Sequence, residues 1–141
     1  MRSHLLALTM ISTLALAAGC GSSRDVKVSG KVATDGSVAG GGPVRVSFYE
    51  LTSGADAGAS AGSGLKLVDS VTLASPGNFE QTVSVEGDKV HVVAVLDVDH
   101  DNACTDGEAW GETETSIGAD DTVSLTVSVA AHATCPAVPA Q

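Results

Sequence analysis

Apolar and polar side chains alternate with a period of two along most of the chain after residue 25. Such alternation, rich in β-branched residues and interrupted by Gly-, Asp- and Ser-rich turns, is typical of β-strands. A seventh strand is predicted near residues 112–117, and no segment after residue 25 shows a helical period. We therefore expect an all-β fold, a small antiparallel β-sandwich of about seven strands. The six clear sets are Val26, Val28 and Val32; Val44, Val46 and Phe48; Leu65, Leu67, Val71 and Leu73; Phe79, Val83 and Val85; Val90, Val92, Ala94 and Leu96; and Val123, Leu125, Val127 and Val129.

The segment from Val90 to Leu96 differs from the others because Val93 and Val95 are also apolar. A strand with apolar residues on both sides is expected to be buried on both faces.

Short motifs within these strands resemble a known class of domain. The chain contains Val28-Ser-Gly-Lys-Val32, then a Gly-rich turn and Pro43-Val-Arg-Val46, and later Pro76-Gly-Asn-Phe79. This arrangement resembles carboxypeptidase-regulatory-like or transthyretin-like domains over about residues 25–130. The resemblance implies a prealbumin-like sandwich of seven strands that serves as a structural or binding module and does not imply catalysis.

The N-terminus has the features of a secretion signal. A positively charged start is followed by an uncharged run from Leu5 to Ala18, which is shorter than the ~20 residues of a membrane-spanning helix. The run ends Leu16-Ala-Ala-Gly-Cys20, which resembles the lipobox of bacterial lipoproteins. The resemblance implies cleavage before Cys20, lipid chains on that cysteine, and an outer-membrane location because Gly21 rather than Asp follows. An ordinary signal peptide with an incidental Cys20 is the alternative.

These features predict four regions. Residues 1–19 are the expected lipoprotein signal peptide, residues 20–24 the lipidated tether, residues 25–135 the β-sandwich domain and residues 136–141 a C-terminal tail. A length of 141 residues favours a single domain.

The charge of the chain bears on its partners more than any other feature of its composition. The chain carries 17 acidic and 7 basic residues and only four aromatic ones, which makes nucleic acid a poor candidate partner. The acidity is concentrated in residues 97–121, which contain nine acids and no Lys or Arg. This local excess indicates a site for a cation.

The start of the acidic segment matches the spacing of an EF-hand calcium loop. In the pattern D-x-[DN]-x-[DN]-G-x₅-E, the sequence from Asp97 to Glu108 fits at positions 1, 3, 5 and 12. Position 6 is Asn102 rather than Gly, and Asn is the non-glycine residue that best tolerates a positive φ. The alternative is a solvated acidic turn. The predicted calcium ligands are Asp97, Asp99, Asp101, the carbonyl of Ala103, Thr105 (its hydroxyl or a water) and Glu108.

The flanks of this loop differ from those of an EF-hand, because a valine-rich strand enters it and no clear helix leaves it. The segment resembles the calcium loops of secreted bacterial β-domains, which implies a structural ion that fixes a long loop between strands. Extracellular calcium modules bind at about 10⁻⁴–10⁻³ M, so we expect weak affinity.

Two cysteines remain if Cys20 is acylated. Cys104 and Cys135 are expected to form a disulfide, because cysteines outside the cytoplasm usually pair. The alternative is a Cys₂His₂ zinc site with His100 and His132, whose spacing from the cysteines is loose.

Three further features are interpreted as structural rather than catalytic or ligand-binding. His91 is expected at the surface, and Trp110 is expected to cap the core rather than to stack on a ligand. The tract Gly58-Ala-Ser-Ala-Gly62 matches G-x-S-x-G, but it lacks the strand, helix and acid–base partners that a hydrolase needs.

The sequence therefore predicts a cell-envelope lipoprotein with a calcium-stabilised β-sandwich and a non-enzymatic structural, adhesive or ligand-binding role. Its expected partners are the membrane, through the lipid anchor, and an envelope protein or ligand that the sequence does not identify. The alternative is a metal-binding protein in which the acidic loop or the His/Cys cluster captures calcium or zinc.

Overall fold

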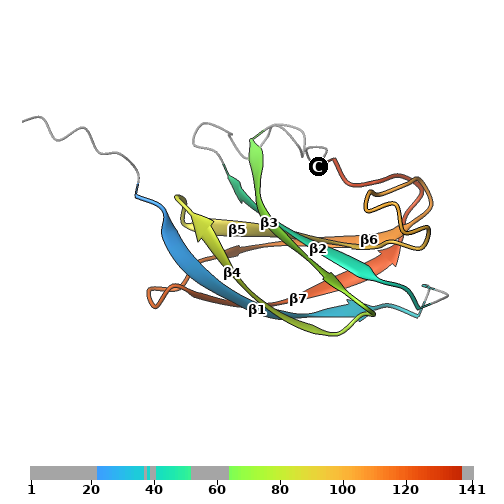
Figure 1. The fold of residues 1–141 in the computed structure, drawn as a ribbon, viewed down its shortest axis with the longest axis horizontal. Coiled ribbons are helices and arrows are strands. Elements are labelled where there is room, and N and C mark those ends of the chain that lie inside the picture. The colour runs from blue at the N-terminus through green and yellow to red at the C-terminus, as the bar shows by residue number, and fades with distance from the viewer. Residues whose placement is uncertain (1–21, 37, 39–40, 52–63, 138–141) are drawn as a thin grey trace, which may run out of the picture.

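The structure, a computed structural model, describes residues 22–36, 38, 41–51 and 64–137. These residues form seven β-strands and no helix (Figure 1). Among them, no helix has the length and apolar character needed to span a bilayer. The expected signal peptide, Cys20 and the Gly58–Gly62 tract lie outside the described residues. The strands are β1 (Arg24–Thr34), β2 (Val44–Leu51), β3 (Leu65–Leu73), β4 (Asn78–Val85), β5 (Lys89–Leu96), β6 (Ala109–Ser116) and β7 (Thr122–Ala131).

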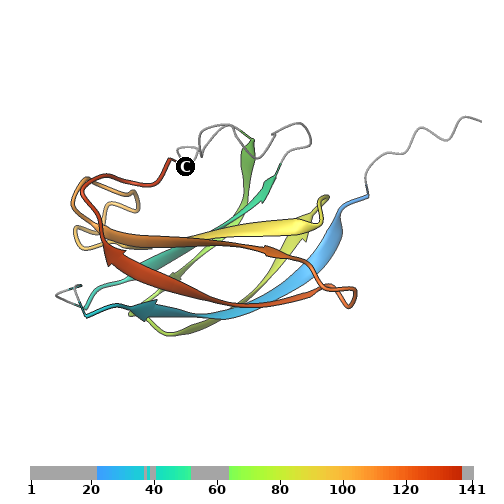
Figure 2. The same ribbon diagram turned by 180° about the vertical axis from the view of Figure 1, so that it is seen from behind.

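The seven strands follow the order β3-β2-β5-β6-β7-β1-β4. Strands β6 and β7 pair over only two positions, Ala109 with Ala131 and Trp110 with Ala130, so two layers meet at this short junction. One layer contains β3, β2, β5 and β6, and the other contains β7, β1 and β4 (Figure 2). The edge strands β3 and β4 also contact each other, where the Gln81 amide donates to Asp69 at 2.6 Å. The result confirms the predicted all-β, sandwich-like fold.

One strand pair departs from the antiparallel arrangement that the sequence led us to expect. Strands β1 and β7 run parallel, with Lys27 opposite Thr122 and Thr34 opposite Val129. A parallel pair needs a long crossover connection, and here the five intervening strands provide it. The other five pairs are antiparallel.

The core lies between the two layers and consists of the alternating apolar positions. Val92, Val93 and Ala94 are all buried, which confirms that β5 is covered on both faces. The Phe48 and Phe79 rings meet edge to face with centroids 5.9 Å apart. The buried cluster is Val26, Val28, Val32, Val44, Val46, Phe48, Phe79, Val83, Val85, Val90, Val92, Ala94, Leu96, Ala109, Val123, Val127 and Val129.

Gly30 allows the Phe79 ring to enter this core. The two residues are register partners in the β1–β4 pair, and a Cβ on Gly30 would lie 2.7 Å from the ring. The glycine of the V-x-G-x-V motif and the phenylalanine of the later G-x-F motif thus form a single packing unit.

Candidate cation site

The loop between β5 and β6 contains the main cluster of potential ligands. Asp97 directly follows β5 and Glu108 directly precedes β6, so the two strands hold the ends of the loop. Both side chains are buried, with 4% and 7% of their surface exposed, whereas Asp99 is exposed. One ligand oxygen from each of Asp97, Asp99 and Glu108 lies within 4.8 Å of the others. This cluster could hold a metal ion.

Backbone N–H groups of the same loop orient the three carboxylates. Asp97 accepts from Asp101 at 3.2 Å and from Asn102 at 3.1 Å. Because each carboxylate has about four acceptor positions, these bonds leave lone pairs for a cation. The loop therefore fixes the direction of the Asp97 carboxylate without using all of its acceptor positions.

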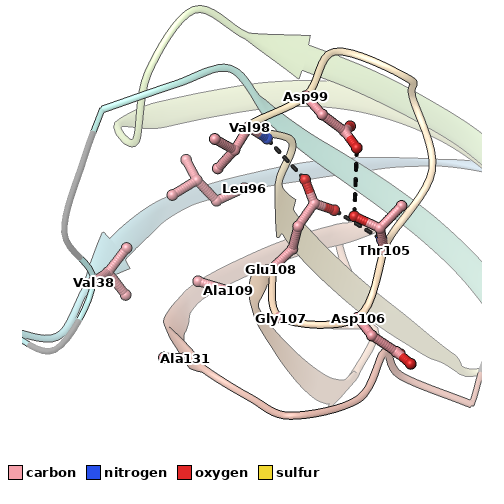
Figure 3. Close-up of a pocket in the computed structure, with 10 residues that line it drawn as sticks. All are labelled: Val38, Leu96, Val98, Asp99, Thr105, Asp106, Gly107, Glu108, Ala109 and Ala131. Carbon is pink, nitrogen blue, oxygen red and sulfur yellow. Dashed lines mark hydrogen bonds between the residues drawn. The ribbon is translucent and has the colours of Figure 1, made fainter.

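Glu108 joins the two halves of the loop, as Figure 3 shows. Its Oε1 accepts from the Val98 N–H at 2.8 Å, and its Oε2 accepts from the Thr105 N–H at 2.9 Å. The Thr105 hydroxyl in turn lies 3.5 Å from Asp99 Oδ2. Thr105 is thus the residue that links Asp99 and Glu108.

The backbone of the loop turns sharply at two non-glycine residues. Asn102 has φ 61°, which confirms the tight turn predicted at position 6. His100 has φ 63°, a second turn that the sequence did not indicate. The Asp101 carboxylate accepts the Ala103 N–H at 2.8 Å and lies outside the cluster of three, and coordination by Asp101, the Ala103 carbonyl and Thr105 stays a prediction.

The electrostatics of the cluster favour a positive ion. Partial desolvation by the loop raises the pKa of Asp99 above its ordinary value, although its side chain is exposed. The N–H of Asp101 lowers this pKa, while the charges of Asp101, Glu108 and Asp97 raise it further. The ionised form of Asp99 is therefore less favourable than in an isolated aspartate, and a nearby cation would offset this difference.

A positive residue that the sequence analysis missed lies beside the loop. The Arg45 guanidinium, on β2, donates a hydrogen bond to the Asn102 carbonyl. Arg45 is distant in sequence, and only the β2–β5 pairing brings it to this end of the fold. It holds the backbone of the loop and does not contact the three clustered carboxylates in any described hydrogen bond or ion pair.

A pocket of about 350 Å³ opens beside the cluster (Figure 3). Apolar side chains form one part of its lining, and Asp99, Thr105 and Glu108 belong to the other part. Val98, which is 61% exposed, lies at this pocket. Asp106 also belongs to the lining, but its carboxylate points away from the other acids in Figure 3. The apolar residues are Val38, Leu96, Val98, Ala109 and Ala131.

The expected disulfide is present. Cys104, in the acidic loop, is bonded to Cys135, which lies 31 residues later and beyond the last strand, with the Cα atoms 5.8 Å apart. Disulfides of this kind are typical of proteins outside the cytoplasm. The alternative of a Cys₂His₂ zinc site is wrong, because both sulfur atoms are committed to the bridge.

Trp110 has a different role from the one expected. It does not belong to the buried core, because alternation along β6 directs Ala109 and Gly111 inward and Trp110 outward. Its indole N–H donates to the Thr134 carbonyl at 2.8 Å, and its ring lies 4.3 Å from the His132 ring. Trp110 therefore binds the C-terminal segment rather than capping the core.

His91 lies on β5, with 13% of its side chain exposed, and is more buried than a surface residue was expected to be. Its Nε2 is 3.2 Å from Glu112 Oε2, and its ring meets Tyr49 edge to face. It lies outside the described cluster of potential metal ligands, and its contacts assign it to packing on the sheet.

Comparison with known proteins adds little to this picture. No protein family and no curated protein matches the chain. The chain is similar to a solved structure of shaft pilin SpaA from Lactobacillus rhamnosus GG, a double mutant, with 12% identity and a TM-score of 0.37. The match covers 77% of this chain and 51% of the pilin, so the chain spans about half the length of that protein.

Proposed function

We propose that this chain is a lipid-anchored cell-envelope protein whose β module has a non-enzymatic structural, adhesive or ligand-binding role, and that calcium holds its 97–108 loop. The observation that carries the calcium assignment is the convergence of Asp97, Asp99 and Glu108 within 4.8 Å. These residues come from both ends of the loop, so one ion bound to all three would close it.

The chemistry of the donors favours calcium over a transition metal. The three side chains offer only carboxylate oxygens, which suit hard cations, and both thiols near the loop are in the disulfide. Calcium accepts six to eight oxygens in flexible geometry, whereas magnesium requires a nearly ideal octahedron. A long loop with exposed residues on most of its length suits the more tolerant ion.

The lipid anchor is proposed from the Leu16–Cys20 motif. Strand β1 begins at Arg24, near the N-terminal end, and runs for 11 residues to the opposite end of the fold, where the 97–108 loop lies (Figure 1). At ~3.3 Å per residue, β1 spans roughly 35 Å. An anchor at Cys20 would therefore place the acidic loop far from the membrane surface, where it can meet soluble ions or partners.

Thermal unfolding in calcium, in magnesium and in a chelator tests the calcium assignment. With a dissociation constant near 10⁻³ M, 10 mM calcium should stabilise the fold by about 1.4 kcal/mol and raise Tm by about 5 °C. Asp99→Asn should abolish this rise. Asp106→Asn, with the same charge change in the same loop, should keep it. An equal rise in magnesium, or an unchanged Tm in calcium, would contradict the assignment.

A further inference from the structure

The segment after β7 returns along the acidic loop and is attached to it. Trp110 contacts this segment twice, through the hydrogen bond to the Thr134 carbonyl and through the ring of His132. Cys135, the residue after Thr134, is covalently bonded to Cys104 in the loop. Three of the four residues from 132 to 135 are thus held against β6 and the loop, and we call residues 132–135 the clasp.

The disulfide attaches the loop at Cys104, next to the residue that links two of the clustered carboxylates. The ends of the loop are held by β5 and β6, and Cys104 attaches its middle. The residue after Cys104 is Thr105, whose N–H binds Glu108 and whose hydroxyl lies by Asp99. Fixing Cys104 therefore restricts the residue that links these two carboxylates.

The bridge is only partly covered by the surrounding residues. Cys104 and Cys135 are each half-buried, and the neighbours Ala103, Thr105 and Thr134 are exposed. Thiols reduce a disulfide that solvent can reach more readily than one that is fully buried. A dithiol reductant therefore has access to the sulfur atoms without unfolding the core.

We propose that the clasp is a redox-released device that holds the acidic loop in its ordered form. One thiolate of a dithiol reductant attacks one sulfur of the Cys104–Cys135 bridge and forms a mixed disulfide, while the S–S bond of the bridge breaks and the other cysteine leaves as a thiolate. The second thiolate of the reductant displaces the protein sulfur, so two electrons pass to the bridge. The products are two protonated cysteines and the oxidised, disulfide form of the reductant. The clasp then separates from Trp110, and the loop becomes mobile.

A consequence for ion binding rests on the proposed function. Loss of the contacts that orient metal ligands typically weakens metal binding by about 10–100-fold. Reduction of the bridge should therefore lower the calcium affinity of the loop by at least about 10-fold.

The test compares the purified full-length chain before and after treatment with dithiothreitol, without calcium. Trp110 is the only tryptophan, so its emission reports the clasp. Reduction should shift this emission to the red and speed amide hydrogen exchange in residues 97–108, while far-UV circular dichroism shows the strands retained. A Cys104→Ser, Cys135→Ser double variant should show the reduced-state values with and without dithiothreitol. Unchanged emission and exchange after complete reduction would overturn the proposal.

Two further results separate this inference from the proposed function. If the oxidised chain does not bind calcium but reduction shifts the emission and speeds the exchange, the clasp is supported and the calcium assignment fails. If the chain binds calcium with equal affinity in both states and the emission does not move, the clasp is refuted and the calcium assignment stands. A Trp110→Phe variant gives an independent measurement, because loss of the indole N–H should speed exchange in the loop while the bridge is intact.

Discussion

Asp97 and Glu108 stand at the first and last positions of a twelve-residue loop, yet their carboxylates face a common point. Both are buried, and both accept backbone N–H groups from inside the loop. The adjoining strands β5 and β6 form an antiparallel pair, and this pairing brings the two ends of the loop together. The sheet, rather than the loop, therefore fixes the distance between the two most buried acids of the candidate site.

Replacement of Asn102 tests the importance of the turn at position 6. Asn102→Gly should leave calcium binding unchanged or slightly tighter, because glycine adopts φ 61° without steric cost. Asn102→Val should weaken binding by about tenfold, since a left-handed β-branched residue costs on the order of 1–2 kcal/mol. Calcium titration of the two variants measures the difference. Equal affinities in both would show that this turn does not matter.

Gly111 should be irreplaceable for stability. A Cβ at this position would overlap the backbone carbonyl of Ser128 on β7, and backbone cannot move aside as a side chain can. Gly111→Ala should destabilise the fold by about 1–3 kcal/mol in urea unfolding. The control is Gly36→Ala, where a Cβ meets nothing within 4 Å, and it should change stability by less than about 0.5 kcal/mol.

The stability of the protein in acid should depend on Glu50. Burial raises the pKa of this carboxyl, but the hydrogen bond from Lys66, the N–H of Glu86 and the charge of Lys66 outweigh it, so the pKa is lowered. A lowered folded-state pKa adds stability that is present above the unfolded pKa and is lost as the pH falls through the folded value.

Glu50→Gln should therefore reduce stability at neutral pH, and the difference from the unchanged chain should shrink as the pH falls below about 4. Urea unfolding at a series of pH values measures it. Glu80→Gln is the control, because Glu80 forms an exposed ion pair with Lys27. A difference that stays constant with pH would contradict the role of Glu50.

Cys20 should determine where the protein resides. In bacterial cells, Cys20→Ala should move the protein from the membrane fraction to the soluble fraction, because the lipid chains would be missing. Fractionation with immunoblotting measures this change. Ser22→Ala, two residues later, is the control and should remain with membranes. Retention of the Cys20→Ala protein in the membrane fraction would refute the lipid anchor.

Most strands could be predicted because their apolar residues alternate around one buried face, and β5 because its apolar residues occupy both faces. Val26, Val28 and Val32 are buried as their spacing requires, and so are the corresponding positions of β2, β4 and β5. The parallel β1–β7 pair could not be predicted, since alternation states which face of a strand is buried but not which neighbour it has. Strand β3 is a partial exception, because it lies at an edge and has no fully buried residue.

The candidate site was predictable only where it is local in sequence. The spacing from Asp97 to Glu108 and the preference of Asn102 for a positive φ are local properties, and both led to the observed loop. Arg45 on β2 contacts the loop from a distant segment, and Thr134, after β7, contacts Trp110 on β6. For Trp110, its position relative to Ala109 and Gly111 on β6 was the available signal that it faces outward.

Isothermal titration of the metal-free chain with calcium is the direct test of ion binding by the 97–108 loop. We expect binding of one ion per chain with a dissociation constant of about 10⁻⁴–10⁻³ M. Binding should be lost in Asp99→Asn and kept in Asp106→Asn. Absence of binding at 10 mM calcium, or equal binding by both variants, would contradict the claim that Asp97, Asp99 and Glu108 form a calcium site.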